Sequence, residues 1–143
     1  MSIYFISIFL TVASNLAYHI CQKSIRPAAH PLASLLVTYL AGIVLTLTAF
    51  KLFYPHLETG AECRKLGWAS YVLGISIVGL ELGFLLAYRA GWNLSLAALY
   101  SNVTVTLVLL PVGILFFKEK VSVVNGVGGL LALLGLVMMG RKS

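Results

Sequence analysis

Glu81 is a carboxylic acid in the middle of an otherwise apolar run, Leu66–Tyr88. A lipid-facing carboxylate at such a depth would cost at least about 3 kcal/mol, so we expect it to face a cavity or a partner. There it can hold a proton or a cationic ligand, but not both at once. Exchange of a proton for a solute is the chemistry that this residue favours. The alternative is a protonated acid that makes one structural hydrogen bond, for example to Asn102 or Asn15.

Two tryptophans place Glu81 close to the middle of a membrane. Trp68 and Trp92 are separated by about 36 Å of helix and suit the two interfacial aromatic belts. Glu81 lies near their midpoint. In the expected arrangement it is the one ionisable side chain that lies away from a helix end.

Other polar side chains recur at steps of three, four or seven residues on several apolar runs, which places them on common helix faces. We expect Asn15, Asn102 and Tyr100 to line a binding site together with Glu81. Ser and Thr residues share these faces, but a hydroxyl can also bond the carbonyl one turn back without any further role.

Five long apolar runs must position these residues. Apolar types make up 60% of the 143 residues and charged types only 10%. Backbone groups in lipid must be hydrogen-bonded within their own segment, so runs of this length predict helices. We predict an all-α membrane protein and a single transmembrane domain over 1–143, with helices over 3–20, 32–54, 66–88, 94–117 and 121–139. The first run lacks the basic region and cleavage site of a secretory signal, so we expect it to be retained.

The last two runs carry features that concern packing. Gly128, Ala132 and Gly135 follow one another at steps of four and three, a small-residue seam that lets another backbone approach closely. Pro111 removes one backbone N–H and loosens a turn, so it is a possible hinge, with a static bend as the alternative.

Several classes of function are disfavoured. The net charge of +6 comes from Lys and Arg scattered over loops and helix ends, which indicates membrane lipids rather than nucleic acid as partners. Cys21 and Cys63 fall on opposite membrane faces and cannot pair within one chain. We find no metal-ligand spacing, no cofactor motif and no nucleophile–base pair, so we expect neither a metal site nor an enzyme.

The cationic loop residues are divided equally between the two predicted membrane faces. The orientation of a membrane protein normally follows an excess of Lys and Arg in the loops on one side, and the sequence predicts no such excess. Either another signal sets one orientation, or the chain inserts both ways. With an odd number of crossings, two oppositely inserted copies would form an antiparallel homodimer. The N-terminal side receives Lys51, Arg64, Lys65, Lys118 and Lys120, and the other side receives Lys23, Arg26, Arg89, Arg141 and Lys142.

Two stretches resemble the EamA-like domains of the drug/metabolite transporter superfamily. One is the run Phe117–Ser122 with Gly128 and Gly135 after it, and the other is Tyr88–Gly91. The resemblance implies half of an inverted-repeat transporter, a cavity lined mainly by the first four helices, small organic solutes or drugs as substrates, and a bacterial-type inner membrane. Many relatives carry two repeats, so this chain must pair with a copy or with a related half-transporter. The resemblance implies no acid at the position of Glu81.

These observations favour a proton-coupled secondary transporter for a small, cationic or amphipathic solute, working as an antiparallel homodimer. The alternative is a non-transporting or heteromeric subunit of a lipid or metabolite flippase.

Overall fold

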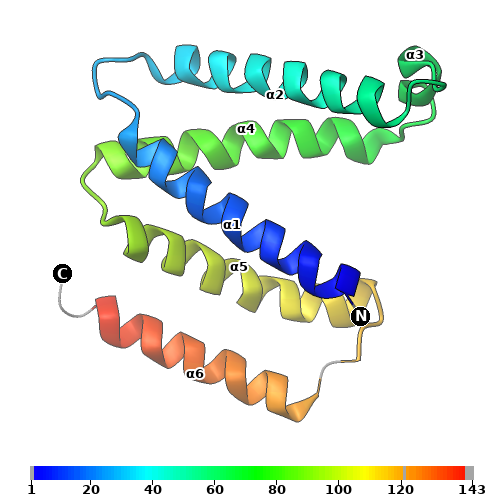
Figure 1. Cartoon of the computed structure of the whole chain (residues 1–143). Helices are drawn as coiled ribbons and strands as arrows, with labels where there is room; N and C mark the ends of the chain where they lie inside the picture. The colour runs from blue at the N-terminus through cyan, green and yellow to red at the C-terminus, as the bar shows by residue number, and fades with distance from the viewer. Residues whose placement is uncertain (1, 121, 141–143) are drawn as a thin grey trace. The chain divides into compact units, whose positions relative to one another are not determined.

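The computed structural model describes residues 2–120 and 122–140, and every regular element in that part of the chain is a helix. The chain forms two compact units, Met1–Gly91 and Trp92–Ser143. The helices are α1 (Ser2–Ser24), α2 (Pro31–Phe53), α3 (Thr59–Cys63) and α4 (Trp68–Arg89) in the first unit, and α5 (Leu94–Phe116) and α6 (Val123–Gly140) in the second (Figure 1).

Four of these helices, α1, α2, α4 and α5, are long and apolar enough to cross a membrane. Their candidate spans have 22 or 23 residues, about 33–35 Å of helix, which exceeds a hydrocarbon core of about 30 Å. Most of their apolar side chains are exposed, as surfaces that face lipid would be. The expected all-helical fold is confirmed for the described residues, and its long helices fit a multi-pass membrane protein.

The structure describes only part of the fifth expected span, 121–139. It begins at Val121, which lies outside the described residues, as do Arg141 and Lys142 from the charge comparison. The helix α6 covers 123–139 of it, and this apolar stretch, Val123–Met139, is shorter than the four long helices. A fifth crossing therefore stays a prediction.

The first helix is longer than its apolar pattern indicated, and the expectation that it ends at Ile20 is wrong. It continues to Ser24, whose Oγ donates a hydrogen bond to the Ile20 carbonyl at 2.7 Å. Lys23 suits this last turn, because a cation is favourable at the C-terminal end of a helix. Pro27 lies shortly beyond and disfavours helix in the residue before it. As a result His19 lies about 7.5 Å inside the helix rather than at its end.

The connection between α2 and α4 also contains more helix than the apolar pattern indicated. The predicted helices over 32–54 and 66–88 leave 55–65 outside any helix, but this segment contains the short helix α3, after which the chain reaches Gly67, the N-cap of α4. Lys65 Nζ forms an exposed ion pair with Glu62 Oε1 at 2.6 Å beside this helix. At its other end α4 stops at Ala90 and Gly91. Gly91 has a φ of +96°, a left-handed conformation that glycine adopts without strain.

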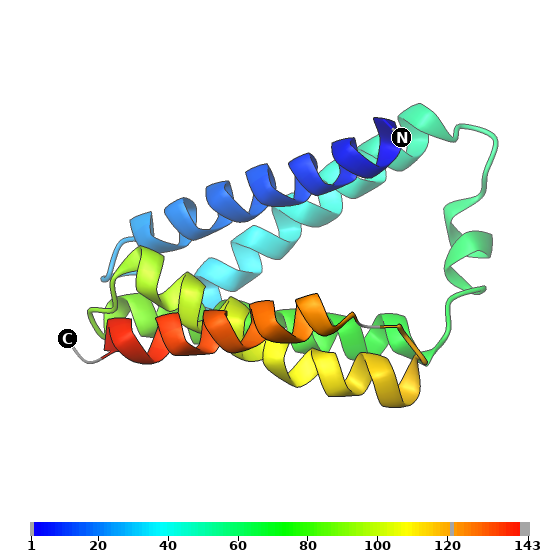
Figure 2. The same cartoon turned by 90° about the horizontal axis from the view of Figure 1, so that it is seen from below.

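In the first unit α4 packs against both α1 and α2. Figure 2 shows α2 separating from α4 toward the end that carries α3. An Arg89 guanidinium nitrogen donates to the Ala29 carbonyl and ties the loop after α1 to the end of α4. The buried side chains of the unit come from all three long helices, and they are His19, Gln22, Leu35, Glu81, Leu85 and Tyr88.

In the second unit α5 packs against α6. The face of α6 that meets α5 carries Gly129, where an added Cβ would touch Leu110, and Leu136, whose carbonyl accepts a hydrogen bond from Tyr100 Oη at 3.3 Å. The predicted small-residue seam lies beside this face. An added Cβ on its members Gly128 and Gly135 would meet no atom within 4 Å. The seam is thus not occupied by α5, and its packing partner stays a prediction.

A tight turn follows the end of α5. The backbone N–H groups of Phe117 and Glu119 both donate to the Gly113 carbonyl, and Lys118 has a φ of +53°. Pro111 lies inside α5, which continues through it to Phe116. Whether that proline acts as a hinge stays a prediction.

Candidate functional site

Glu81 lies where α4 meets α1 and α2, and its side chain is only 8% exposed. It is eight residues from the end of α4 at Arg89, about 12 Å along the helix, so its carboxyl group cannot reach water beyond that end. Its Oε2 atom is buried and has no hydrogen-bond partner. Buried polar atoms are almost always bonded, so an unpartnered carboxylate oxygen indicates a place that a proton or ligand can occupy.

Polar and aromatic side chains of α1 pack beside this acid. Gln22 Nε2 lies 3.4 Å from both the Glu81 backbone carbonyl and Tyr18 Oη. His19 Nδ1 and Tyr88 Oη form a buried hydrogen bond of 2.8 Å. Phe84 packs against His19, and the two rings meet edge-on with 4.7 Å between their centroids. We refer to Tyr18, His19, Gln22, Phe84 and Tyr88 as the α1–α4 cluster.

The α1–α4 cluster corrects one expectation. Glu81 is not the one ionisable group away from a helix end, because His19 is 6% exposed and lies well inside α1. This residue lay at the end of the apolar run, and the three polar residues that close the helix, Gln22, Lys23 and Ser24, looked like part of the following connection. The spacing of Tyr18 and Gln22, four apart and hence on one face, was the available signal.

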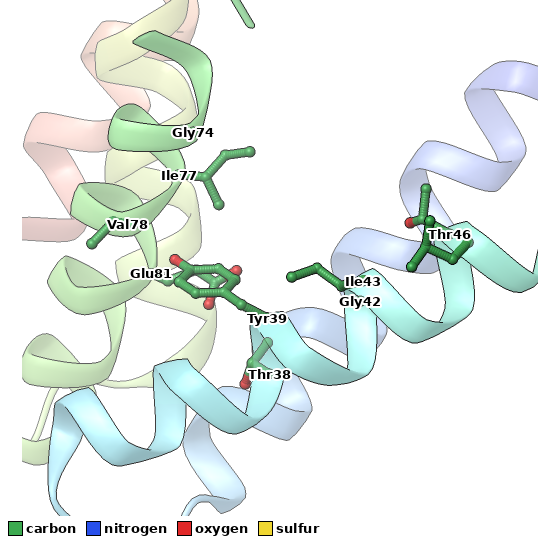
Figure 3. Close-up of a pocket in the computed structure, with 10 residues that line it drawn as sticks. Thr38, Tyr39, Gly42, Ile43, Thr46, Gly74, Ile77, Val78 and Glu81 are labelled. Atoms are coloured by element: carbon green, nitrogen blue, oxygen red, sulfur yellow. The ribbon is translucent and has the colours of Figure 1, made fainter. Parts of the chain in front are cut away.

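A groove of about 660 Å³ runs between α2 and α4 and has Glu81 at one end. Tyr39 lies at the same end, with a buried hydroxyl that has no hydrogen-bond partner, and it interacts electrostatically with Glu81. Figure 3 shows the two helices close together near Tyr39 and Glu81 and further apart near Thr46 and Gly74. The lining residues of this α2–α4 groove are Thr38, Tyr39, Gly42, Ile43, Thr46, Leu47, Gly74, Ile77, Val78 and Glu81.

The other predicted site residues are Asn15, Asn102 and Tyr100. Asn15 is exposed on α1, one turn before Tyr18 and His19. Asn102 and Tyr100 belong to α5 in the second unit, where Asn102 is exposed and Tyr100 is hydrogen-bonded to α6. In the first unit the residues that interact with Glu81 include Gln22, Tyr18 and Tyr39. The roles of Asn15, Asn102 and Tyr100 stay predictions.

The fold is all-helical over the described residues, its four long apolar helices fit a multi-pass membrane protein, and a buried acid lies at the end of an apolar groove. Comparison of the chain with protein-family models, with curated proteins and with solved structures finds no match. The function must accordingly be argued from the residues themselves.

The hydrogen bond between Tyr88 and His19 yields a first prediction. Tyr88→Phe should lower the free energy of unfolding by about 1 kcal/mol, because it leaves a buried His19 nitrogen without its partner. Unfolding in mixed micelles with increasing SDS measures this change. Tyr71→Phe is the matched control on the same helix, at a residue that is 71% exposed, and should change little. Equal losses for the two variants would contradict a structural role for the bond.

Proposed function

We propose that this chain is a subunit of a secondary membrane transporter, in which Glu81 alternately binds a proton and a small organic solute. The supporting observation is the buried Glu81 carboxyl group, with an unpartnered oxygen, at the end of the α2–α4 groove. Ionisable residues inside membrane segments are costly, and they commonly mark ion and substrate pathways. Binding of either a proton or a cationic group would satisfy the carboxyl, and competition between them couples solute movement to the proton gradient.

The working unit in this proposal is an antiparallel homodimer of five-helix chains in a bacterial-type inner membrane, with α6 as the fifth crossing. The five apolar runs of the sequence, and the equal division of cationic loop residues that five crossings would give, support this proposal. The likeness of residues 117–122 to EamA-like domains of the drug/metabolite transporter superfamily supports it as well. The seam of Gly128, Ala132 and Gly135, which α5 does not occupy, offers a surface for helix packing.

Transport is tested with the purified chain in liposomes. A thermal-shift screen of organic solutes at two pH values selects compounds that stabilise the protein, and their uptake is then measured with and without an imposed pH gradient. We expect accumulation that depends on the gradient. Stabilising solutes that show no protein-dependent uptake under either condition would contradict the proposed transport and favour a non-transporting subunit.

The antiparallel arrangement makes a specific cross-linking prediction. Cys21 and Cys63 are both exposed, and in an antiparallel pair the Cys21 of one copy shares a membrane face with the Cys63 of the other. Cys21→Ser and Cys63→Ser chains should each fail to cross-link alone. Coexpressed with different tags, they should give cross-linked heterodimers with a short thiol reagent.

Parallel dimers would give the opposite pattern, with each single-cysteine chain cross-linking to itself. Tags on both termini add an independent measurement, because dual insertion exposes each tag on both membrane faces. One fixed orientation in every molecule would contradict the homodimer and favour a heteromeric flippase subunit.

A further inference from the structure

The α2–α4 groove has a restricted chemistry. Glu81 is its one charged lining residue, and most of the remaining lining is apolar or glycine. The Thr38 hydroxyl donates to the Ser34 carbonyl at 3.0 Å, so its hydrogen is already used within α2. Among the described residues no Lys, Arg or His lines the groove, which leaves a carboxylate or phosphate group on a ligand without a cationic partner there.

The end of the groove near Glu81 suits a positive charge. The carboxyl oxygen Oε2 is unpartnered in a side chain that is more than nine-tenths buried, and a cation is the complement that such a group lacks. The Tyr39 ring lies at the same end, and aromatic faces attract cations. Aliphatic side chains of Ile43, Ile77 and Val78 line the groove beyond this end and can cover an apolar body.

The size of the groove fits a solute rather than an ion or a helix. Its volume of about 660 Å³ falls within the usual range for small-molecule sites, about 300–1,000 Å³. Gly42 and Gly74 contribute to this space, since an added Cβ at either position would meet no atom within 4 Å.

From these features we infer that the α2–α4 groove binds a monovalent organic cation with a bulky apolar body. The charged centre lies against the Glu81 carboxylate and the Tyr39 ring, and the apolar body lies along Ile43, Ile77 and Val78. This assignment rests on the proposed function and names its class of solute, but it concerns binding alone.

Equilibrium dialysis of the purified full-length chain in a non-ionic detergent tests the assignment. The probe is tetraphenylphosphonium, and tetraphenylborate serves as an anion of the same shape. We expect the cation to bind at about one site per chain and the anion to bind no better than to empty micelles. Glu81→Gln should weaken binding of the cation by about 10- to 100-fold, because it removes the one charged partner. Glu58→Gln removes an exposed acid and should change nothing.

A second pair of variants tests the groove independently of charge. Gly42→Leu fills the groove without a backbone clash and should weaken binding of the cation by at least about tenfold. Ala41→Leu adds a leucine to the same helix outside the groove lining and should have no effect. Size-exclusion profiles and helical circular dichroism confirm that each variant is folded.

Equal binding of cation and anion, or binding that survives both Glu81→Gln and Gly42→Leu, would overturn the assignment, as would a wild-type chain that binds neither probe. The proposed transport is judged separately by gradient-driven uptake. A chain that transports another solute but does not bind the cation refutes only the ligand class. Specific cation binding without any uptake refutes transport but not the site.

Discussion

Glu81→Gln is expected to reduce pH-gradient-driven uptake to the level of protein-free liposomes. Glutamine keeps the size of the side chain and its capacity for hydrogen bonds, but it cannot take up or release a proton. Because Glu81 lies at the end of the α2–α4 groove, its loss removes the group for which proton and solute compete. The measurement is uptake of a stabilising solute into liposomes with an imposed gradient.

Two control variants separate this effect from a loss of folding. Glu58→Gln removes an exposed acid outside the groove and should transport like the wild type. Glu81→Asp retains a titratable group at a shorter reach, so gradient dependence should persist at a lower rate. Full retention of gradient-driven uptake by Glu81→Gln would contradict proton coupling through this residue.

Leu85→Ala is expected to lower the free energy of unfolding by about 2 kcal/mol. Leu85 is 1% exposed and follows Glu81 by one turn on the face of α4 that carries the buried residues. Truncating a buried leucine leaves a cavity, and the cost grows with the volume that the surroundings cannot fill. This loss of stability is at the low end for truncation of a buried leucine. Lipid is as apolar as leucine, so transfer of the side chain between lipid and the protein interior contributes little free energy.

The neighbouring residue provides a direct control for this prediction. Leu86 is 49% exposed, so Leu86→Ala removes the same atoms from a surface where lipid can replace them. SDS-induced unfolding of both variants in mixed micelles gives the comparison. If the two variants lost the same stability, Leu85 would not belong to the packed interior where α1, α2 and α4 meet.

The long helices were predictable because each is much longer and more apolar than a soluble helix needs to be. The predicted starts and ends of the second and fourth runs agree with α2 and α5 to within one residue. The end of the first helix was missed because apolarity falls at Cys21 while backbone hydrogen bonding continues to Ser24. The apolar pattern of a segment indicates which residues contact lipid, but it does not indicate the residue at which the helix ends.

The acid of the candidate site was predictable, but most of its surroundings were not. Glu81 stands out because a carboxyl group is costly in a membrane span. Tyr39 is one aromatic residue among many in an apolar helix, and its place opposite Glu81 has no local signal. His19 lay next to the expected end of the first helix, and Gln22 lay just beyond it. The predicted partners Asn15, Asn102 and Tyr100 were chosen by polarity, which does not say which helices meet.

The amino-acid sequence by itself determined the helical class of the fold, because a backbone in lipid must bond to itself within a helix. It also predicted the depth of Glu81 from the constant rise of a helix, and that depth stays a prediction. Only the tertiary structure decided that Gln22 and Tyr39 lie near that acid, that His19 bonds to Tyr88, and that a groove opens between α2 and α4. Helical periodicity assigns a residue to a face of its own helix. The angle and position at which two helices cross depend on how their side chains interlock, and this is a property of the pair.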